Sequence, residues 1–202
     1  MFIIGLTGGT GSGKTTALSV LESLGALALD CDAIYHDLLR NNTKLVSELE
    51  DRFPGVLKDG MIDRKYLAAI VFSEPSALLD LNKITHKYIC EAVEHRLAQW
   101  DSLGGKVAVI DAIALIESGL SDLCDVVVGV TAQRVTRLSR IVIRDGITLE
   151  QAEMRINAQK PDSFFSENCD YLLENDYTEQ KDFEERCVGF FNGLIGGFTN
   201  AD

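Results

Sequence analysis

Gly8-Gly9-Thr10-Gly11-Ser12-Gly13-Lys14-Thr15 is the stretch that decides the fold of this chain. It follows the apolar run Phe2-Ile3-Ile4-Gly5-Leu6 and precedes a helix-like run over residues 16–24. The stretch matches G-x-x-x-x-G-K-[ST] between a strand and a helix, which is the context of a phosphate-binding P-loop. Its glycines let backbone N–H groups turn inward as an anion nest, and the helix N-terminus adds partial positive charge. The sequence therefore predicts a phosphate site at this loop.

The P-loop pattern assigns a chemical role to its last residues. Lys14 is expected to reach the β- and γ-phosphates and the Thr15 hydroxyl to ligate Mg²⁺, an arrangement that moves a phosphoryl group. The alternative is a glycine-rich turn that binds nothing, but the matched strand and helix on either side favour a nucleotide site. The residues expected to bind ATP in this stretch are Gly9, Gly11, Ser12, Gly13, Lys14, Thr15 and Thr16.

Composition limits the class of protein. The 202 residues suit one compact α/β unit with insertions. Nineteen basic and 31 acidic residues give a formal net charge of −12, which disfavours nucleic acid as a general partner because phosphate-backbone binding needs a basic surface. The five cysteines form no C-x-x-C pair, so neither a disulfide framework nor a zinc site is indicated. Without a signal-peptide pattern or an apolar run of about 18 residues, we expect a cytoplasmic protein with no membrane segment and no obligate protein partner.

Two carboxylates follow the second apolar run. Residues 26–29 lead into Asp30-Cys31-Asp32, and a helix is expected over residues 33–40. Parallel strands in open α/β sheets place functional groups at their carboxyl ends, so this pair can serve the phosphate site. Either aspartate can instead act only as the N-cap of the helix. The neighbouring P-loop favours a second role beyond capping.

Residues 41–100 change to helical spacing of apolar side chains, and no strand pattern interrupts them. A helical insertion of this length exceeds what a simple crossover needs, so we expect it to hold the second substrate. Two polar residues stand out here, Arg64 and His86. Spacing alone assigns neither a function, because Asp63 is a good helix cap that places Arg64 on an exposed first turn, and a lone histidine is usually structural.

A third strand-like run, residues 106–110, ends at Asp111. A carboxylate in that position next to a P-loop resembles the Walker B pattern, which holds Mg²⁺ directly or through water. Many buried parallel strands end in aspartate, so the pattern is weak without the P-loop. With the P-loop present, we expect Thr15 and Asp111 on the metal side of the site. A fourth strand follows over residues 125–130, with Thr131 expected to cap the next helix.

Four arginines gather between residues 132 and 148 against one acid, Asp145, in a chain that is otherwise acidic. Arg137, Arg140 and Arg144 follow helical spacing and share one face. Such a stripe can be a solvated surface, but near a P-loop guanidinium groups match phosphate oxygens and neutralise charge on a transferring phosphoryl group. Gly146 and a capping box at Thr148 divide the segment into short helices, which is typical of a mobile lid that excludes water.

These elements define the predicted fold class: an α/β protein with a P-loop NTPase-type parallel sheet flanked by helices, a helical substrate-domain insertion and a small helical lid. The predicted nucleotide-binding core comprises residues 1–40, 104–133 and 168–202, the helical domain comprises residues 41–103, and the lid comprises residues 134–167. A last strand is expected over residues 169–173, followed by Asn175 and a terminal helix. Residues 196–202 are expected to form a loose tail.

Several short stretches along nearly the whole chain share one family pattern. They are Gly5-Leu6-Thr7-Gly8-Gly9, Gly11-Ser12-Gly13-Lys14, Asp30-Cys31-Asp32-Ala33-Ile34, Ile62-Asp63-Arg64, Val71-Phe72, Ile84-Thr85-His86, Asp111, Leu115-Ile116-Glu117-Ser118-Gly119-Leu120, Arg140, Arg144-Asp145-Gly146, Gln159, Asp170 and Asn175. In this combination the chain resembles the dephospho-CoA kinase family. The P-loop alone indicates only a large superfamily. The chain departs from the family pattern at Lys87, at Ile113-Ala114-Leu115 and at Phe165.

The resemblance implies a kinase of coenzyme A biosynthesis that uses ATP with Mg²⁺ to phosphorylate the ribose 3′-hydroxyl of dephospho-CoA, giving CoA and ADP. It implies that Asp32 orients or deprotonates that hydroxyl. It also implies that Arg140 and Arg144 are lid residues that meet the phosphates and act with Lys14 in catalysis. The remaining residues it points to are Arg64, His86 and Leu115 for the acceptor and Asn175 for ATP.

Two other classes of function remain open at the level of sequence. One is a different small-molecule kinase on the same scaffold, and the other is a nucleotide-binding switch without kinase turnover. The absence of an N-K-x-D guanine signature, and of D-x-x-G after the strand that ends at Asp111, disfavours a GTP switch.

Overall fold

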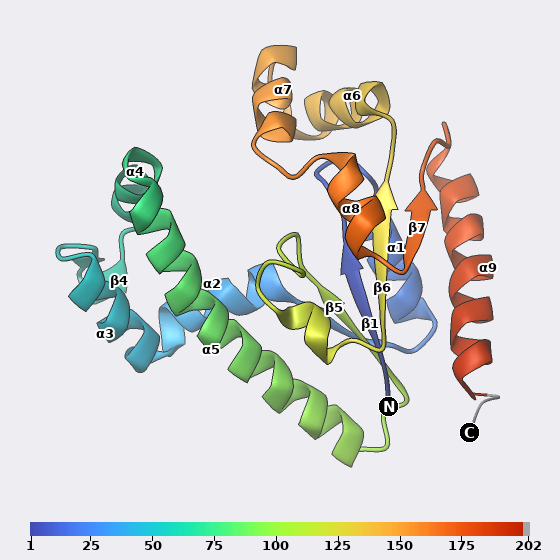
Figure 1. The fold of residues 1–202 in the computed structure, drawn as a ribbon, viewed down its shortest axis with the longest axis horizontal. Helices are drawn as coiled ribbons and strands as arrows, with labels where there is room; N and C mark the ends of the chain where they lie inside the picture. Colours follow the sequence, from blue (N-terminus) through green and yellow to red (C-terminus); the bar gives the residue numbers. More distant parts are fainter. Residues whose placement is uncertain (200–202) are drawn as a thin grey trace. The chain divides into compact units, whose positions relative to one another are not determined.

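The structure is a computed structural model that describes residues 1–199. A sheet with strand order β2-β5-β1-β6-β7 forms its centre (Figure 1). Strand β1 pairs in parallel with β5 and β6, and β6 pairs in parallel with β7. The prediction of a parallel sheet is thus confirmed. The strands are β1 (Phe2–Thr7), β2 (Leu27–Asp30), β5 (Val107–Asp111), β6 (Val126–Thr131) and β7 (Tyr171–Glu174).

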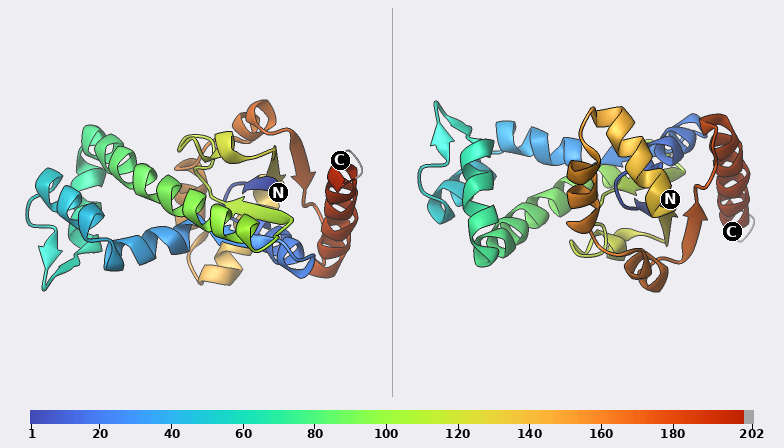
Figure 2. Two further views of the ribbon diagram at one scale, coloured as in Figure 1. Left: turned by 90° about the horizontal axis from the view of Figure 1, so that it is seen from below. Right: turned by 90° about the horizontal axis from the view of Figure 1, so that it is seen from above.

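One face of the sheet packs against two helices, α1 (Lys14–Ser23) and α9 (Gln180–Thr199). Alternate residues of β1, among them Ile4 and Leu6, are completely buried there against Ala17 and Leu21 of α1 and Phe191 of α9. The alternation follows from the two-residue period of a strand. Figures 1 and 2 show α9 lying along β7 at the edge of the sheet. This layer fixes α1, and with it the P-loop, at the carboxyl end of β1.

On the opposite face of the sheet, two glycines allow the covering segments to pack closely against the strands. A Cβ atom on Gly5 would lie 2.7 Å from Leu115 Cδ2, and one on Gly129 would lie 3.0 Å from Cys169 Sγ. Both positions therefore need the missing side chain for close approach. The short helices η1 (Leu120–Leu123) and α8 (Asp162–Asn168) belong to this covering, with α8 in contact with β6 and β7.

Two aspartates fasten the amino ends of neighbouring strands. Asp125 precedes β6 and accepts a hydrogen bond from Ile3 N through Oδ2 at 2.7 Å. Asp170 precedes β7 and accepts one from Val127 N through Oδ2, also at 2.7 Å. Each aspartate thus satisfies a backbone donor of the next strand in the sheet and fixes its register.

The lid begins after β6 with α6 (Arg134–Asp145) and α7 (Leu149–Asn157), whose facing sides share a small core of Leu138, Ile141, Ala152 and Ile156. Gly146 ends α6 in the left-handed conformation, and the capping box of Thr148 with Gln151 is confirmed. The expected cap at Thr131 is wrong. Thr131 is still in β6, paired with Glu174, and Gln133 occupies the N-cap position.

Residues 30–99 form a second compact unit, separate from the unit of residues 1–29 and 100–202. Its helices are α2 (Cys31–Asn41), α3 (Thr43–Arg52), α4 (Arg64–Ser73) and most of α5 (Pro75–Ser102). They enclose their own core, with Leu45, Leu49 and Phe53 among its most buried members. This division assigns α2 to the helical unit, whereas the sequence placed the start of that domain at residue 41.

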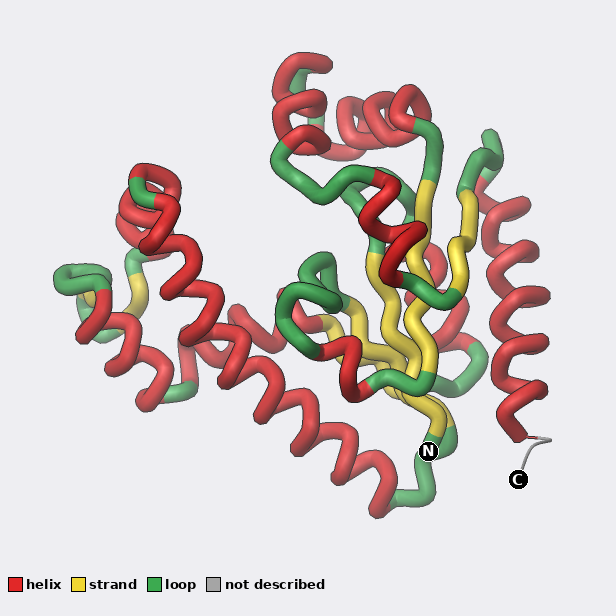
Figure 3. Tube along the Cα trace, viewed as in Figure 1, coloured by secondary structure: helices red, strands yellow, loops and turns green. Residues whose placement is uncertain are grey.

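The expectation that no strand interrupts this segment is wrong. Strands β3 (Leu57–Lys58) and β4 (Met61–Ile62) form a short antiparallel hairpin, drawn in Figures 1 and 3. Asp59 and Gly60 connect them with φ values of 52° and 79°. An Asp-Gly pair with positive φ at both positions is typical of a two-residue hairpin turn. The strands are too short for their alternation to stand out in the sequence.

The ends of the chain complete the description. Helix α9 runs to Thr199, so the expectation of a loose tail is wrong for residues 196–199 and lies outside the described residues for 200–202. Among the described helices, none combines the length and the apolar character that a membrane crossing needs.

Candidate active site

The P-loop lies between β1 and α1, and its last glycine shows why the pattern requires that residue. Gly13 is the N-cap of α1 with φ 105° and ψ 15°. Side chains rarely adopt this backbone conformation. A Cβ atom here would also lie 2.1 Å from Nδ2 of Asn175. The turn into the helix therefore needs glycine for both its φ and its close contact.

Asn175, which directly follows β7, contacts the P-loop. Its side chain is buried, and its Nδ2 donates a hydrogen bond to the Ser12 carbonyl at 2.8 Å. Its backbone N–H bonds to the Thr131 carbonyl at 2.8 Å, which extends the β6–β7 pairing by one residue. The sheet therefore delivers this amide to the loop, and the structure brings Asn175 and Ser12 together as two of the residues expected to bind ATP.

Lys14 and Asp111 meet at the carboxyl edge of the sheet. Strands β1 and β5 are neighbours, with Leu6 in register with Asp111. The Lys14 ammonium forms an ion pair with Oδ1 of Asp111, and their side chains are 15% and 9% exposed. A charge pair this buried is strongly coupled, because little water screens it. The P-loop lysine and the Walker B-like carboxylate thus belong to one site.

The donor set around this pair fits a magnesium ion. Thr15 is exposed on the first turn of α1, so its hydroxyl is accessible, and Asp111 supplies a carboxylate. In the described part of the chain no three His, Cys, Asp or Glu side chains form a metal-binding group. Mg²⁺ commonly needs only one or two protein oxygen ligands, because it keeps several waters and binds substrate phosphates.

Arg140 of α6 contacts the P-loop and the end of β7. Its Nη1 donates to the carbonyls of Gly11 and Ser12 at 3.3 and 3.4 Å. Its Nη2 donates to Oδ1 of Asn175 at 3.1 Å and to the Tyr177 carbonyl at 3.0 Å. Partial burial lowers the pKa of this guanidinium, which the nearby Asp176 carboxylate counteracts. Arg140 therefore stands at the phosphate loop, bound to backbone oxygens.

Arg144 lies one turn further along α6 and is exposed. Its guanidinium donates to both oxygens of Asp145, at 2.7 and 3.0 Å. These bonds raise the pKa of Arg144 and lower the pKa of Asp145, which also pairs with Arg155. The structure thus does not place Arg144 on the P-loop, and its contact with phosphate stays a prediction.

Arg137, the first member of the predicted arginine stripe, is the least exposed of the three. Only 3% of it is accessible, and it shares the buried side of α6 with Leu138 and Ile141. Its Nε donates to the carbonyl of Thr10 in the P-loop at 2.9 Å. The sequence predicted the helix face that carries Arg137 but not the burial of its side chain. The local sequence around an arginine is the same whether or not a distant loop covers that arginine.

The two aspartates at the start of α2 differ in their contacts. Asp30 is the N-cap of α2, and its Oδ1 accepts a hydrogen bond from Ala33 N at 3.0 Å. Asp32 lies in the first turn with an exposed side chain. Within the described part of the chain no hydrogen bond or ion pair occupies its carboxylate. The capping role therefore belongs to Asp30, which leaves Asp32 available for chemistry.

Arg64 lies near the helix that carries Asp32. It is the first residue of α4, and Asp63 caps that helix as expected. Burial raises the pKa of the Tyr35 phenol, and the positive charge of Arg64 partly offsets that rise. Tyr35 lies one turn after Asp32 on α2. His86 is half-buried on α5, and its role toward the acceptor stays a prediction.

Leu115 and Phe165, which were named with the family resemblance, lie in apolar packing. Leu115 is completely buried, in the layer that covers Gly5, so an acceptor would reach its side chain only if this loop moved. Phe165, where the chain was expected to depart from the family pattern, is 2% exposed and packs edge-on against Phe164. Its ring is part of the apolar packing of the sheet unit.

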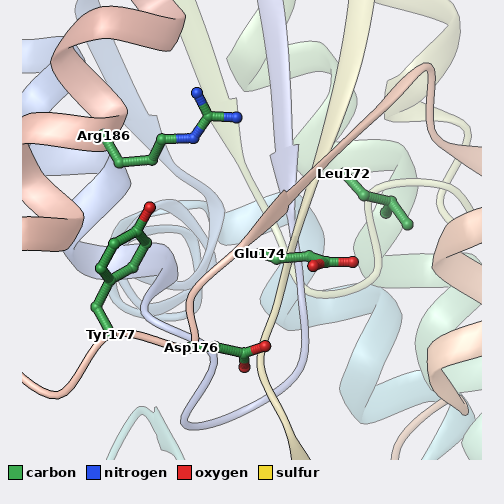
Figure 4. Close-up of a pocket in the computed structure, with 5 residues that line it drawn as sticks. All are labelled: Leu172, Glu174, Asp176, Tyr177 and Arg186. Atoms are coloured by element: carbon green, nitrogen blue, oxygen red, sulfur yellow. The ribbon is translucent and has the colours of Figure 1, made fainter.

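A cavity of about 340 Å³ lies beside β7 and the start of α9. Figure 4 shows Arg186 and Tyr177 on one side and Glu174 and Asp176 on the other, with Leu172 further along the strand. Two carboxylates make this cavity unfavourable for a triphosphate, because like charges repel in partly dry surroundings. This cavity is therefore a poor candidate for the phosphate site, which stays predicted at the P-loop.

Comparison with known proteins assigns the chain to a family. The family model for dephospho-CoA kinase matches residues 2–181. A curated dephospho-CoA kinase from Geobacter sulfurreducens is 38% identical over 183 residues, covering 90% of this chain and 93% of that protein. The solved dephospho-CoA kinase from Campylobacter jejuni aligns with a TM-score of 0.70 and 26% identity over 96% of this chain and 98% of its own. A solved Thermus thermophilus protein aligns with a TM-score of 0.80 and 29% identity over 96% of this chain and 97% of its own. The chain belongs to the dephospho-CoA kinase family.

Proposed function

We propose that this chain transfers the γ-phosphoryl group of ATP to the ribose 3′-hydroxyl of dephospho-CoA and releases CoA and ADP. The observation that carries the proposal is the Lys14–Asp111 pair beside the P-loop, in a chain that belongs to this kinase family. A lysine at the start of α1 and a carboxylate at the end of β5 provide the two contacts that a metal-bound triphosphate needs. The five cysteines form no disulfide within residues 1–199, which is consistent with the cytoplasmic location we propose.

The P-loop binds the ATP phosphates in this proposal. Backbone N–H groups of Gly9, Gly11 and Gly13 contribute to the nest, and the start of α1 adds its partial positive charge. The Ser12 hydroxyl oxygen is buried and has no hydrogen-bond partner in the described part of the chain. Buried hydroxyls usually have a partner, so a phosphate oxygen in the loop would satisfy this group. Thr16 and Asn175 complete the proposed set.

The metal side of the site is assigned to Thr15 and Asp111. Both offer oxygen ligands, directly or through water, which are the ligands Mg²⁺ prefers. The ion, when bound, supplies charge neutralisation at the β- and γ-phosphates. The Asp111 carboxylate would then turn from Lys14 toward the metal side, while Lys14 turns toward phosphate oxygens.

Asp32 is the proposed base for the acceptor. A ribose hydroxyl is a weak nucleophile near neutral pH, so a carboxylate must orient it and accept its proton as the new P–O bond forms. The Asp32 carboxylate is exposed and has no partner in the described part of the chain, so it is suited to this role. The bond from the γ-phosphorus to the leaving ADP oxygen breaks in the same transfer. Arg64 and His86 are proposed to hold the anionic acceptor within the helical unit.

Arg140 and Arg144 are the proposed lid contacts. Planar guanidinium groups stabilise charge that spreads over phosphoryl oxygens in the transition state. Arg140 already lies at the P-loop, on the carbonyls of Gly11 and Ser12, so it can reach phosphate by exchanging weak partners for a charged one.

An assay of ADP release across acceptors tests the function. We expect turnover with ATP, Mg²⁺ and dephospho-CoA, and none with a dephospho-CoA analogue that lacks the ribose 3′-hydroxyl. The analogue keeps every binding group except the nucleophile, so it is the matched control. Faster turnover with another acceptor would identify a different small-molecule kinase, and hydrolysis that ignores every acceptor would support a nucleotide switch instead.

A further inference from the structure

The buried guanidinium of Arg137 joins three segments of the sheet unit. Its Nε donates to the Thr10 carbonyl at 2.9 Å, its Nη1 to Oδ1 of Asp162 at 2.9 Å, and its Nη2 to Oε1 of Gln159 at 3.3 Å. Thr10 belongs to the P-loop, Gln159 to the link between α7 and α8, and Asp162 begins α8. One side chain thus links the phosphate loop to the connection between α7 and α8 and to the first residue of α8.

Thr10 is held from both sides of its backbone. Its carbonyl accepts from Arg137, and its N–H donates to Oε1 of Gln159 at 2.8 Å. The same Gln159 oxygen accepts from Arg137, so the three groups form a closed triangle. The N–H belongs to the Gly9–Thr10 peptide and the carbonyl to the Thr10–Gly11 peptide, so the two bonds hold the peptide planes on both sides of Thr10, the second through a charge-assisted bond. The orientation of the P-loop backbone at Thr10 therefore depends on lid residues.

The P-loop is shaped to accept α6 at close range. A Cβ atom on Gly9 would lie 2.3 Å from Nη2 of Arg137, and one on Gly11 would lie 2.8 Å from the Arg137 carbonyl. These two glycines therefore provide room for the arginine as well as donors for the nest. Burial lowers the pKa of Arg137, and the Asp162 carboxylate counteracts that shift. The Asp162 carboxylate therefore stabilises the charged form of the buried guanidinium.

We infer that Arg137 is a positioning residue, which holds Thr10 and thereby the anion nest in the shape that receives the ATP phosphates, and that Asp162 and Gln159 act through it. The inference rests on the proposed function only for the nucleotide. Arg137 directs its three bonded nitrogens to protein oxygens, so it orders the loop through the backbone and does not bind a phosphate itself.

A cavity of about 410 Å³ supplies the competing explanation. Arg134, Arg137 and Lys160 line it, together with Asp162. In that case Arg137 would bind an anion directly, and Asp162 would compete with that anion for the guanidinium. The two explanations predict opposite effects for Asp162, whose carboxylate is 56% exposed and bonds to Arg137.

The test is a titration of Asp162→Asn and Arg137→Lys with ATP and Mg²⁺ in the absence of any acceptor, by calorimetry. Asp162→Asn retains the hydrogen bond but removes the charge that fixes Arg137. Arg137→Lys retains a charge but cannot reach three partners at once. Arg134→Gln is the matched control, because Arg134 is an exposed arginine on the same helix that bonds to Asn157.

We expect both variants to weaken ATP binding, Arg137→Lys by on the order of tenfold, since it loses charge-assisted hydrogen bonds, and Asp162→Asn by less. Gln159 protects the Thr10 amide, so the hydrogen exchange rate of this amide should rise in both variants. The rate should stay unchanged in Arg134→Gln. Tighter ATP binding in Asp162→Asn, or an unchanged exchange rate at Thr10 in Arg137→Lys, would overturn the inference. The melting temperature of each variant shows whether a loss comes from global unfolding.

Failure of this inference is distinguishable from failure of the proposed function. The titration and the amide exchange need no acceptor, so they report on the nest even if dephospho-CoA is not the substrate. An acceptor-dependent assay that shows no transfer to dephospho-CoA would reject the proposed reaction and leave the role of Arg137 standing.

Discussion

Lys14 couples the chemistry of the site to its folding. Its ion pair with Asp111 is largely buried, so removing the lysine takes a close positive charge away from a buried carboxylate. We predict that Lys14→Ala abolishes phosphoryl transfer and also lowers the free energy of unfolding by about 3 kcal/mol, the lower end for a broken buried pair. Asp111→Asn in the same chain should restore much of the stability and none of the turnover.

Urea unfolding and ADP release measure the two effects separately. If the single variant kept near-normal turnover, the P-loop role of Lys14 would be wrong. The double variant Lys14→Ala/Asp111→Asn removes both charges of the pair. If it were no more stable than Lys14→Ala alone, the loss of stability would come from the lost packing of the lysine methylene groups.

Asp30 and Asp32 allow a sharper comparison than either residue alone. Asp30 caps α2, whereas Asp32 is exposed and unpaired in the described part of the chain. We predict that Asp32→Asn lowers kcat by roughly 10² to 10⁴, the usual effect of a positioned acid or base, with an unchanged melting temperature. Asp30→Ala should instead cost about 1 kcal/mol of stability through the lost cap.

Steady-state kinetics and thermal unfolding of both variants check this pair. Full turnover in Asp32→Asn would remove Asp32 from the reaction and make Asp30 the first alternative base. A large fall in the melting temperature of Asp32→Asn would show that its carboxylate also supports the helix, through its place in the first turn.

Among the elements, the sequence identified the strands and helices best where burial is strong. Apolar runs predicted β1, β5 and β6, because strands covered on both faces lose the polar alternation that could obscure them. The β3–β4 hairpin was missed, because two-residue strands carry no periodicity and Asp59-Gly60 looks like any surface turn. Thr131 was taken for a cap because its pairing with β7 is a long-range contact.

The candidate site was predictable to the same extent. Consecutive residues of the P-loop identify themselves, since the nest is made locally. Which aspartate caps α2, and which arginine of α6 is buried, depend on segments far away in the sequence. Arg137 is covered by a loop more than 120 residues earlier, with Thr10 and Arg137 separated by 127 positions. No local pattern could reveal that contact.

The lid arginines differ in what they hold, which predicts different responses to substitution. Arg144 is exposed, and Asp145 keeps Arg155 when Arg144 is removed. Arg144→Ala should therefore lower kcat more than it raises the KM of the acceptor, and leave the melting temperature unchanged. Arg140→Ala should lower kcat as well, by up to ~10³, and also destabilise the P-loop that it supports.

Lysine variants separate charge from geometry. Arg140→Lys and Arg144→Lys should not restore full kcat, because a point charge lacks the planar fork. A rise only in the KM for the acceptor, with kcat unchanged, would reassign either residue to ground-state binding. Arg134→Gln serves again as the exposed arginine on the same helix.

The aspartates at the amino ends of β6 and β7 give a prediction at the level of the sheet. Asp170 satisfies the Val127 N–H at 2.7 Å, so its removal leaves a strand donor without a partner. We predict that Asp170→Ala lowers the free energy of unfolding by about 1–3 kcal/mol, the cost of an unsatisfied buried group. Urea unfolding measures the loss, with the exposed Glu167→Ala as control. Equal stability of the two variants would contradict the fastening role of Asp170.

At the scale of the whole molecule, the chain has two compact units with separate cores. The unit in which a substrate slows amide hydrogen exchange therefore identifies where that substrate binds. A non-hydrolysable ATP analogue with Mg²⁺ should slow amide hydrogen exchange at residues 9–16, because phosphate oxygens become partners for nest donors. Dephospho-CoA should slow exchange within residues 30–99, above all in the first turns of α2 and α4 that carry Asp32 and Arg64. Sulfate at the same ionic strength is the control, since it can occupy the nest but resembles no part of the acceptor beyond a phosphate. If dephospho-CoA slowed exchange only within residues 1–29 and 100–202, the proposal that the helical unit holds the acceptor would be contradicted. The proposed role of Asp32 as the base for the 3′-hydroxyl would then be contradicted as well.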